Sequence, residues 1–102
     1  MIQTALAKEL PAVIRILREN HVQRAYAFGS VCTDQFNADS DIDLLIAFDE
    51  SLDSVQYGEH YFAIAHALER VLKRPVDLVT ERSLKNPYFI NMVNKTKTPI
   101  YE

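Results

Sequence analysis

"GSVCTDQFNADSDIDLLIAF", residues 29–48, joins a Gly-Ser pair to two aspartates that stand at the start of an apolar run. Residues two apart on a β-strand point to the same side, so Asp41 and Asp43 project together while the residue between them faces the packing layer. A strand that is buried on both faces reads as a nearly continuous apolar run, as residues 44–48 do. The stretch therefore predicts a core strand over residues 41–48, with two carboxylates on one face at its start.

These carboxylates indicate a metal site. Two neighbouring carboxylates repel each other unless a proton or a cation lies between them, and oxygen-only ligation favours hard ions such as Mg²⁺ or Mn²⁺. A third acid, Asp77, stands inside the predicted strand 76–80, where it is costly unless it is paired, hydrogen-bonded or metal-bound. Carboxylates from two neighbouring strands form a platform for two-metal phosphoryl chemistry. We therefore expect Asp41, Asp43 and Asp77 to be catalytic residues and ligands of two metal ions.

The Gly-Ser pair indicates a nucleotide site beside these acids. A glycine after a strand lets backbone N–H groups approach a phosphate closely, and the start of a following helix adds the positive end of its dipole. Ser30 adds a hydroxyl donor. A triphosphate between Gly29-Ser30 and cations held by Asp41 and Asp43 implies phosphoryl or nucleotidyl transfer, in which positioning and charge neutralisation carry most of the catalysis. Gly29 and Ser30 are thus the candidate nucleotide-binding residues.

The spacing of apolar residues predicts one domain, residues 1–102, of the α/β (α+β) class, with a small mixed β-sheet covered by helices. Pro11 either bends a helix over residues 4–20 or begins a second helix in its first turn. Asn86 is a candidate cap for a helix over residues 88–95. The other predicted elements are strands over residues 24–28, 76–80 and 98–101, a helical turn over residues 30–36, a loop over residues 37–40 and a helix over residues 54–73.

Composition excludes several classes of protein. The formal net charge is −3 and no basic block occurs, so we expect no extended nucleic-acid surface. No apolar run approaches the roughly 18 residues of a membrane span, and residues 1–10 do not read as a signal peptide. The single cysteine, Cys32, excludes an intramolecular disulfide. These observations favour a cytoplasmic protein in a reducing compartment.

Together, the motifs resemble a known family. Gly29-Ser30, ten intervening residues and Asp41-Ile42-Asp43 followed by apolar residues resemble the signature of the polymerase-β-like nucleotidyltransferase superfamily. Asp77 stands where the third carboxylate of that superfamily is expected. The shortness of the chain makes it similar to the minimal nucleotidyltransferases (MNT) of bacteria and archaea, and the resemblance runs over residues 13–101. It implies the polymerase-β-like nucleotidyltransferase fold.

The resemblance also implies roles and partners. In the family, the residues that match Asp41 and Asp43 bind both metal ions, and the one that matches Asp77 binds the catalytic metal and helps to activate the attacking hydroxyl. Many members act as the antitoxin of a helical HEPN-domain toxin. The implied function is therefore Mg²⁺-dependent transfer of a nucleoside monophosphate, AMP from ATP, to a hydroxyl acceptor on a HEPN partner, within a hetero-oligomer.

One departure from the family leaves an alternative open. Many members carry an arginine after the Gly-Ser pair that is thought to meet the phosphates, whereas this chain has Cys32-Thr33-Asp34. The alternative function is a binding module with a decayed nucleotide site, which neutralises its partner by masking it. The candidate replacements for the missing arginine are Arg24, Lys73, Arg74 and Lys85.

Overall fold

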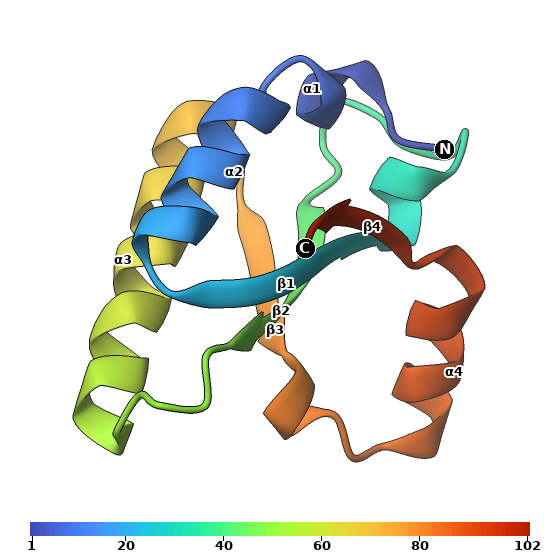
Figure 1. Ribbon diagram of the computed structural model, residues 1–102. Coiled ribbons are helices and arrows are strands. Elements are labelled where there is room, and N and C mark those ends of the chain that lie inside the picture. Colours follow the sequence, from blue (N-terminus) through green and yellow to red (C-terminus); the bar gives the residue numbers. More distant parts are fainter.

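A computed structural model describes all residues from Met1 to Glu102 and contains one four-stranded sheet in the order β3-β2-β1-β4 (Figure 1). β1 pairs antiparallel with β2 and with β4, whereas β2 and β3 are parallel. The small mixed sheet predicted from the sequence is therefore confirmed. The strands are β1 (Val22–Phe28), β2 (Ile42–Phe48), β3 (Val76–Thr80) and β4 (Thr98–Tyr101).

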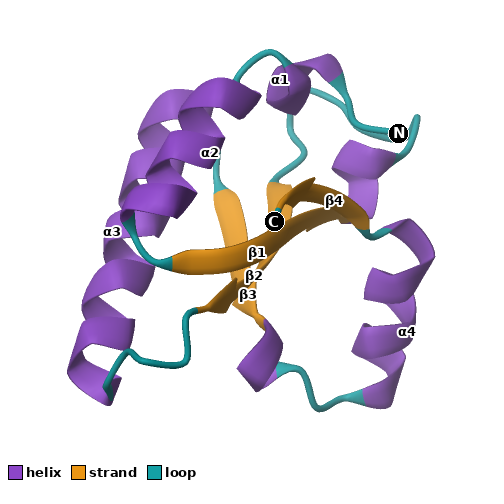
Figure 2. Cartoon of the chain, in the orientation of Figure 1, coloured by secondary structure: helices purple, strands orange, loops and turns teal.

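Helices cover both faces of this sheet, as Figure 2 shows. Side chains of α1, α2 and α3 pack on one face, and those of α4 pack on the other. None of the helices combines the length and the apolar composition that a membrane crossing requires. The helices are α1 (Thr4–Ala7), α2 (Leu10–Glu19), α3 (Ser54–Leu72) and α4 (Pro87–Thr96), and two 3₁₀ turns are η1 (Gly29–Cys32) and η2 (Glu81–Ser83).

β2 runs through the hydrophobic core and is buried on both faces. Leu44 and Ile46 contribute to the larger cluster, which also holds the apolar side chains of α1, α2 and α3. Leu45 points the other way and packs with Phe28 and Val93 in a smaller cluster beneath α4. We call the face that carries Leu45 the α4 face. Burial on both faces explains why β2 reads as a continuous apolar run rather than an alternating one.

The structure differs from the sequence prediction at several places; the strand predicted over residues 41–48, for example, begins at Ile42. The helix predicted over residues 4–20 is two helices, so the second alternative for Pro11 is confirmed: it lies in the first turn of α2, where its missing N–H costs no hydrogen bond. The turn predicted over residues 30–36 already ends at Cys32, and β1 begins at Val22 instead of Arg24. The three-residue turn η2 is too short to leave a periodic pattern.

The predicted start of α4 is confirmed in detail. The Asn86 side-chain oxygen accepts hydrogen bonds from the N–H groups of Tyr88 at 2.9 Å and Phe89 at 3.3 Å. These two donors have no partner within the helix, so the cap satisfies them. The cap fixes the position at which α4 starts to cross the sheet.

We predict that Asn86→Ala lowers the free energy of unfolding by about 1 kcal/mol, because it leaves the two N–H groups uncapped. Urea denaturation measures this change. Asn91→Ala is the matched control, since Asn91 is exposed within the same helix and caps nothing. Equal effects of the two substitutions would contradict the assignment of the cap.

Candidate functional site

Two of the three predicted site aspartates lie side by side at one end of the sheet. The parallel register pairs Asp43 of β2 with Asp77 of β3, and the antiparallel register pairs Asp43 with Phe28 of β1. Paired residues on neighbouring strands project from the same face, so Asp43 and Asp77 both stand on the α4 face, on backbones about 4.8 Å apart. Asp41 immediately precedes β2 and is exposed. The row formed by Phe28, Asp43 and Asp77 is the frame of the candidate site.

Gly29 brings the Gly-Ser turn against this row. It follows Phe28 directly and has a φ of +73°, a conformation that residues with a Cβ rarely adopt. A Cβ added to Gly29 would collide with the Oδ2 atom of Asp43 and lie 3.3 Å from its carboxyl carbon. The absence of a side chain therefore does two things at once: it allows the turn and leaves room for the carboxylate.

The surroundings of Asp43 make its negative charge unfavourable. Its side chain is half-buried, and burial is the main effect that raises the pKa of its carboxyl from 3.8 to about 6. The charges of Asp77 and then of Asp41 raise that pKa further, and no hydrogen bond offsets them. A cation close to Asp43 would relieve all of these effects.

The three carboxylates differ in how far they are brought together. Asp43 and Asp77 are in register, whereas Asp41 lies at the entry of the strand, and no three His, Cys, Asp or Glu side chains stand close enough to form a metal centre. The available donors are nevertheless the carboxylate oxygens that Mg²⁺ and Mn²⁺ prefer. The donor chemistry therefore fits a hard divalent cation, and the complete ligand set stays a prediction.

The Gly-Ser turn is held by a residue that sequence reasoning misses. The Gly29 N–H donates to Thr96 Oγ1 at 2.8 Å, so this particular N–H is already used. The Ser30 carbonyl accepts the N–H and the hydroxyl of Thr33, both at 2.9 Å. No motif marks Thr96, which lies 67 residues along the chain from Gly29 and meets it only because α4 ends beside η1. Ser30 is then the donor of the pair that is left for a ligand.

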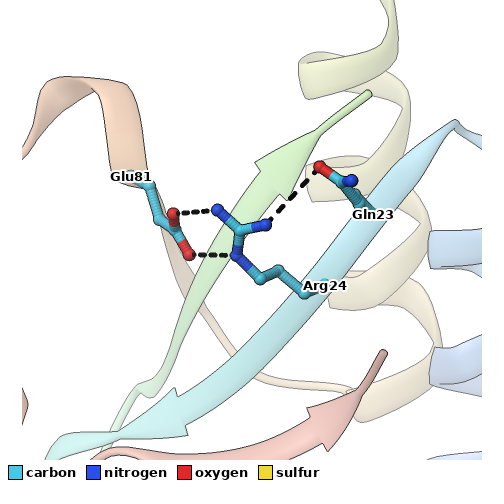
Figure 3. Close-up of polar contacts among 3 residues, drawn as sticks. All are labelled: Gln23, Arg24 and Glu81. Carbon is cyan, nitrogen blue, oxygen red and sulfur yellow. Dashed lines mark hydrogen bonds and ion pairs between the residues drawn. The ribbon is translucent and has the colours of Figure 1, made fainter. Parts of the chain in front are cut away.

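Arg24 is engaged elsewhere. Figure 3 shows its guanidinium paired with the Glu81 carboxylate, with Nε–Oε2 at 2.9 Å and Nη2–Oε1 at 2.7 Å. Hydrogen bonding to Arg24 is also the main cause that lowers the pKa of Glu81. Arg24 is opposite Ala47, four residues along β2 from Asp43, and lines a cavity of about 530 Å³ at that other end of the strand. It therefore does not replace the missing phosphate-binding arginine.

Comparison with known proteins identifies relatives of this chain. The profile of the family described as "Polymerase beta, Nucleotidyltransferase" matches residues 12–102. A protein of Methanocaldococcus jannaschii named a "putative protein adenylyltransferase" is 35% identical over 75 residues, which are 72% of this chain and 73% of that protein. The family profile covers nearly the whole chain and includes every candidate site residue.

Two solved structures show the same fold. One, described as a "putative minimal nucleotidyltransferase", has a TM-score of 0.70 and 30% identity, and the alignment covers 97% of this chain and 96% of the other. The second is the MNT antitoxin complex of the tri-AMPylated HEPN toxin from Shewanella oneidensis. It has a TM-score of 0.64 and 25% identity, and the alignment covers 92% of this chain and 70% of the other. The polymerase-β-like fold expected from the sequence is confirmed.

We predict that Gly29→Ala destabilises the protein by more than the roughly 1–2 kcal/mol that a left-handed conformation costs, because the new methyl group also displaces the Asp43 carboxylate. Thermal unfolding measures the loss. Gly58→Ala is the control: nothing lies within 4 Å of the added methyl group, and alanine in a helix should stabilise the protein by about 0.5–1 kcal/mol. In an Asp43→Ala background the cost of Gly29→Ala should fall, and an unchanged cost would refute the collision.

We also predict that Asp43→Asn stabilises the metal-free protein at pH 7.5. A folded-state pKa above the unfolded value means that stability falls as pH rises from about 4 to about 6, and then stays low. The gain should be of order 1 kcal/mol, since solvent screens a half-buried group. Urea denaturation in EDTA at pH 7.5 and pH 4 measures it, with Asp39→Asn in the exposed loop as the control. A gain for Asp43→Asn that is the same at both pH values would contradict the assigned burial and repulsion.

Proposed function

This chain belongs to the polymerase β nucleotidyltransferase family, and on that premise we propose that it transfers AMP from ATP to a hydroxyl group of a HEPN-domain partner, as the antitoxin of a toxin–antitoxin pair. The observation that carries the proposal is the register of Asp43 with Asp77, against which Gly29 lies without a side chain. An enzyme of this class needs carboxylates and a close-approach turn at one place. The proposal explains why the fold keeps both there.

In this function, Asp41 and Asp43 would hold two Mg²⁺ or Mn²⁺ ions, and Asp77 would be a further ligand of one of them. Bound metal would neutralise phosphate charge and lower the pKa of the attacking hydroxyl. Asp77 is exposed at the edge strand β3, where a hydroxyl from a second protein has access to it. Its carboxylate oxygen is therefore suited to accept the proton of that hydroxyl.

The Gly-Ser turn has the complementary role of receiving the nucleotide. Gly29 lets the backbone turn directly after β1, with the space on its Cβ side taken by the Asp43 carboxylate. The Ser30 hydroxyl at this turn donates a hydrogen bond to a phosphate oxygen. The bond from Gly29 N–H to Thr96 Oγ1 holds the turn in place before any nucleotide binds. A turn fixed in this way loses little conformational freedom on binding.

The partner and the acceptor are supported by likeness. The MNT antitoxin that shares the fold is in complex with a HEPN toxin that carries AMP groups, and the relative from Methanocaldococcus jannaschii is named for adenylyl transfer to protein. The first matches 92% of this chain and the second 72%. A cytoplasmic HEPN toxin with an exposed hydroxyl side chain is therefore the proposed acceptor.

One observation favours the second candidate, a masking antitoxin without catalysis. The arginine that many relatives carry after the Gly-Ser pair is absent here, and both Arg24 and Arg74 already bond to the protein itself. A site with fewer free cations binds a triphosphate less tightly. In this alternative the fold serves only to bind the toxin.

We predict that the chain, mixed with Mg²⁺, α-³²P-labelled ATP and its HEPN-domain partner, transfers the label to that partner. Asp43→Asn should abolish the transfer, because it removes a metal ligand while it preserves the shape of the side chain. Electrophoresis with autoradiography detects the labelled partner.

Asp39→Asn is the matched control for this assay, since it makes the same change four residues earlier in an exposed loop. It should leave transfer unchanged. If Asp43→Asn and the unmodified chain neutralise the toxin equally well and neither labels it, masking is the function and the proposed transfer is wrong.

A further inference from the structure

The segment that links the two halves of the site has little secondary structure of its own. After η1 ends at Cys32, residues 33–40 form turns and bends until β2 begins. We call these residues the linking segment. Its internal bonds are local, such as Asn37 N–H to Ser40 Oγ at 3.0 Å. Local bonds of this kind shape a turn but do not fix its position on the sheet.

Distant parts of the chain hold the segment: Gln3 Nε2 donates to the Thr33 carbonyl at 2.7 Å, and Phe36 packs against the larger core cluster. Arg74 makes the long-range contacts nearest to β2. Its Nη1 atom donates to the Ser40 carbonyl at 2.7 Å and to the Asn37 carbonyl at 3.1 Å. Its guanidinium carbon also lies 4.5 Å from the centre of the Phe36 ring, in a cation–π contact. One half-buried side chain thus holds the linking segment at three points.

Arg74 lies close to the starts of β2 and β3, the strands that carry Asp43 and Asp77. It precedes Pro75, whose carbonyl accepts the Ile42 N–H at 3.1 Å, and it lies three residues before Asp77. Ser40, whose carbonyl accepts the shorter of the two hydrogen bonds from Arg74, is the residue before Asp41. The same side chain therefore connects the start of β3 with the start of β2, where Asp41 has no strand partner of its own.

We propose that Arg74 is a positioning residue, which holds Ser40 so that the Asp41 carboxylate is turned toward Asp43 and Asp77 when a divalent cation binds. The inference rests on the proposed function, because it assigns Asp41 to the metal site. The linking segment then has a role besides connecting η1 to β2, because the position of Ser40 at its end determines where Asp41 lies.

The geometry requires the shape of arginine as well as its charge. A guanidinium donates within its plane and stacks on an aromatic ring with its face, so Arg74 can bind two carbonyls and Phe36 together. A lysine ammonium is a compact, strongly hydrated point charge and cannot do both. A lysine at position 74 should consequently keep the charge and lose the positioning.

Calorimetric titration of the folded chain with Mn²⁺ tests the proposal without any transfer reaction. Arg74→Gln should weaken Mn²⁺ binding about tenfold, the usual effect of removing a group that orients a metal ligand, and Arg74→Lys should weaken it nearly as much. Arg70→Gln, the same change at an exposed site on α3, should leave affinity unchanged. In an Asp41→Asn background, Arg74→Gln should cause little further loss, because the residue through which it acts is gone.

Each other result overturns the proposal in a distinct way. Unchanged Mn²⁺ affinity in Arg74→Gln, beside normal binding by the unmodified chain, leaves the proposed function standing and removes Arg74 from it. Full recovery by Arg74→Lys assigns the effect to charge alone. No binding by the unmodified chain refutes the metal site itself. If Arg74→Gln fails to fold, Phe36→Leu tests the same contact, with a few-fold weaker affinity expected and an unchanged one contradicting the proposal.

Discussion

The parallel pairing of β2 with β3 forces two carboxylates together, and the rest of the site is arranged around that constraint. Asp43 and Asp77 are in register, and burial together with neighbouring negative charge disfavours ionisation of Asp43. A hydrophobic sheet would normally avoid such a pair, because charge at a half-buried position costs free energy. Gly29 makes room for the Asp43 carboxylate, and Thr96 holds the turn that contains Gly29. The protein therefore keeps an unfavourable charge pair in a rigid surrounding, as binding sites for cations require.

Much of the fold could be predicted because its signals are local. The continuous apolar run of β2 indicates burial on both faces, and the predicted bounds of β3 and β4 agree with the structure. Asn86 and Pro87 mark the start of α4 by their own chemistry. Local chemistry was enough for each of these features. The two-residue period of a strand also predicts Asp41 and Asp43 on one side, but Asp41 lies just before β2, so for Asp41 this stays a prediction.

The contacts that sequence reasoning missed join residues that are far apart in the chain. Thr96 binds Gly29 over 67 residues, Glu81 binds Arg24 over 57, and Arg74 binds Ser40 over 34. These pairs depend on the strand order and on where helices end, which no short window of sequence contains. For the same reason the sequence does not show which candidate cations are free to bind a phosphate. Arg24 and Arg74 have no partner close to them in the sequence, yet both bind groups of the protein.

The burial of β2 on both faces has an evolutionary consequence. Inserting or deleting one residue within this strand would reverse the facing of all strand residues on one side of the change, so the two core clusters and the pairing of Asp43 with Asp77 could not all be kept. Residues 33–40 carry no such alternation, because they lie outside the sheet and are held by distant parts of the chain only at Thr33 and at the residues that touch Arg74. Among descendants of this sequence, length variation should therefore gather between η1 and β2, while the strand itself evolves by substitution alone.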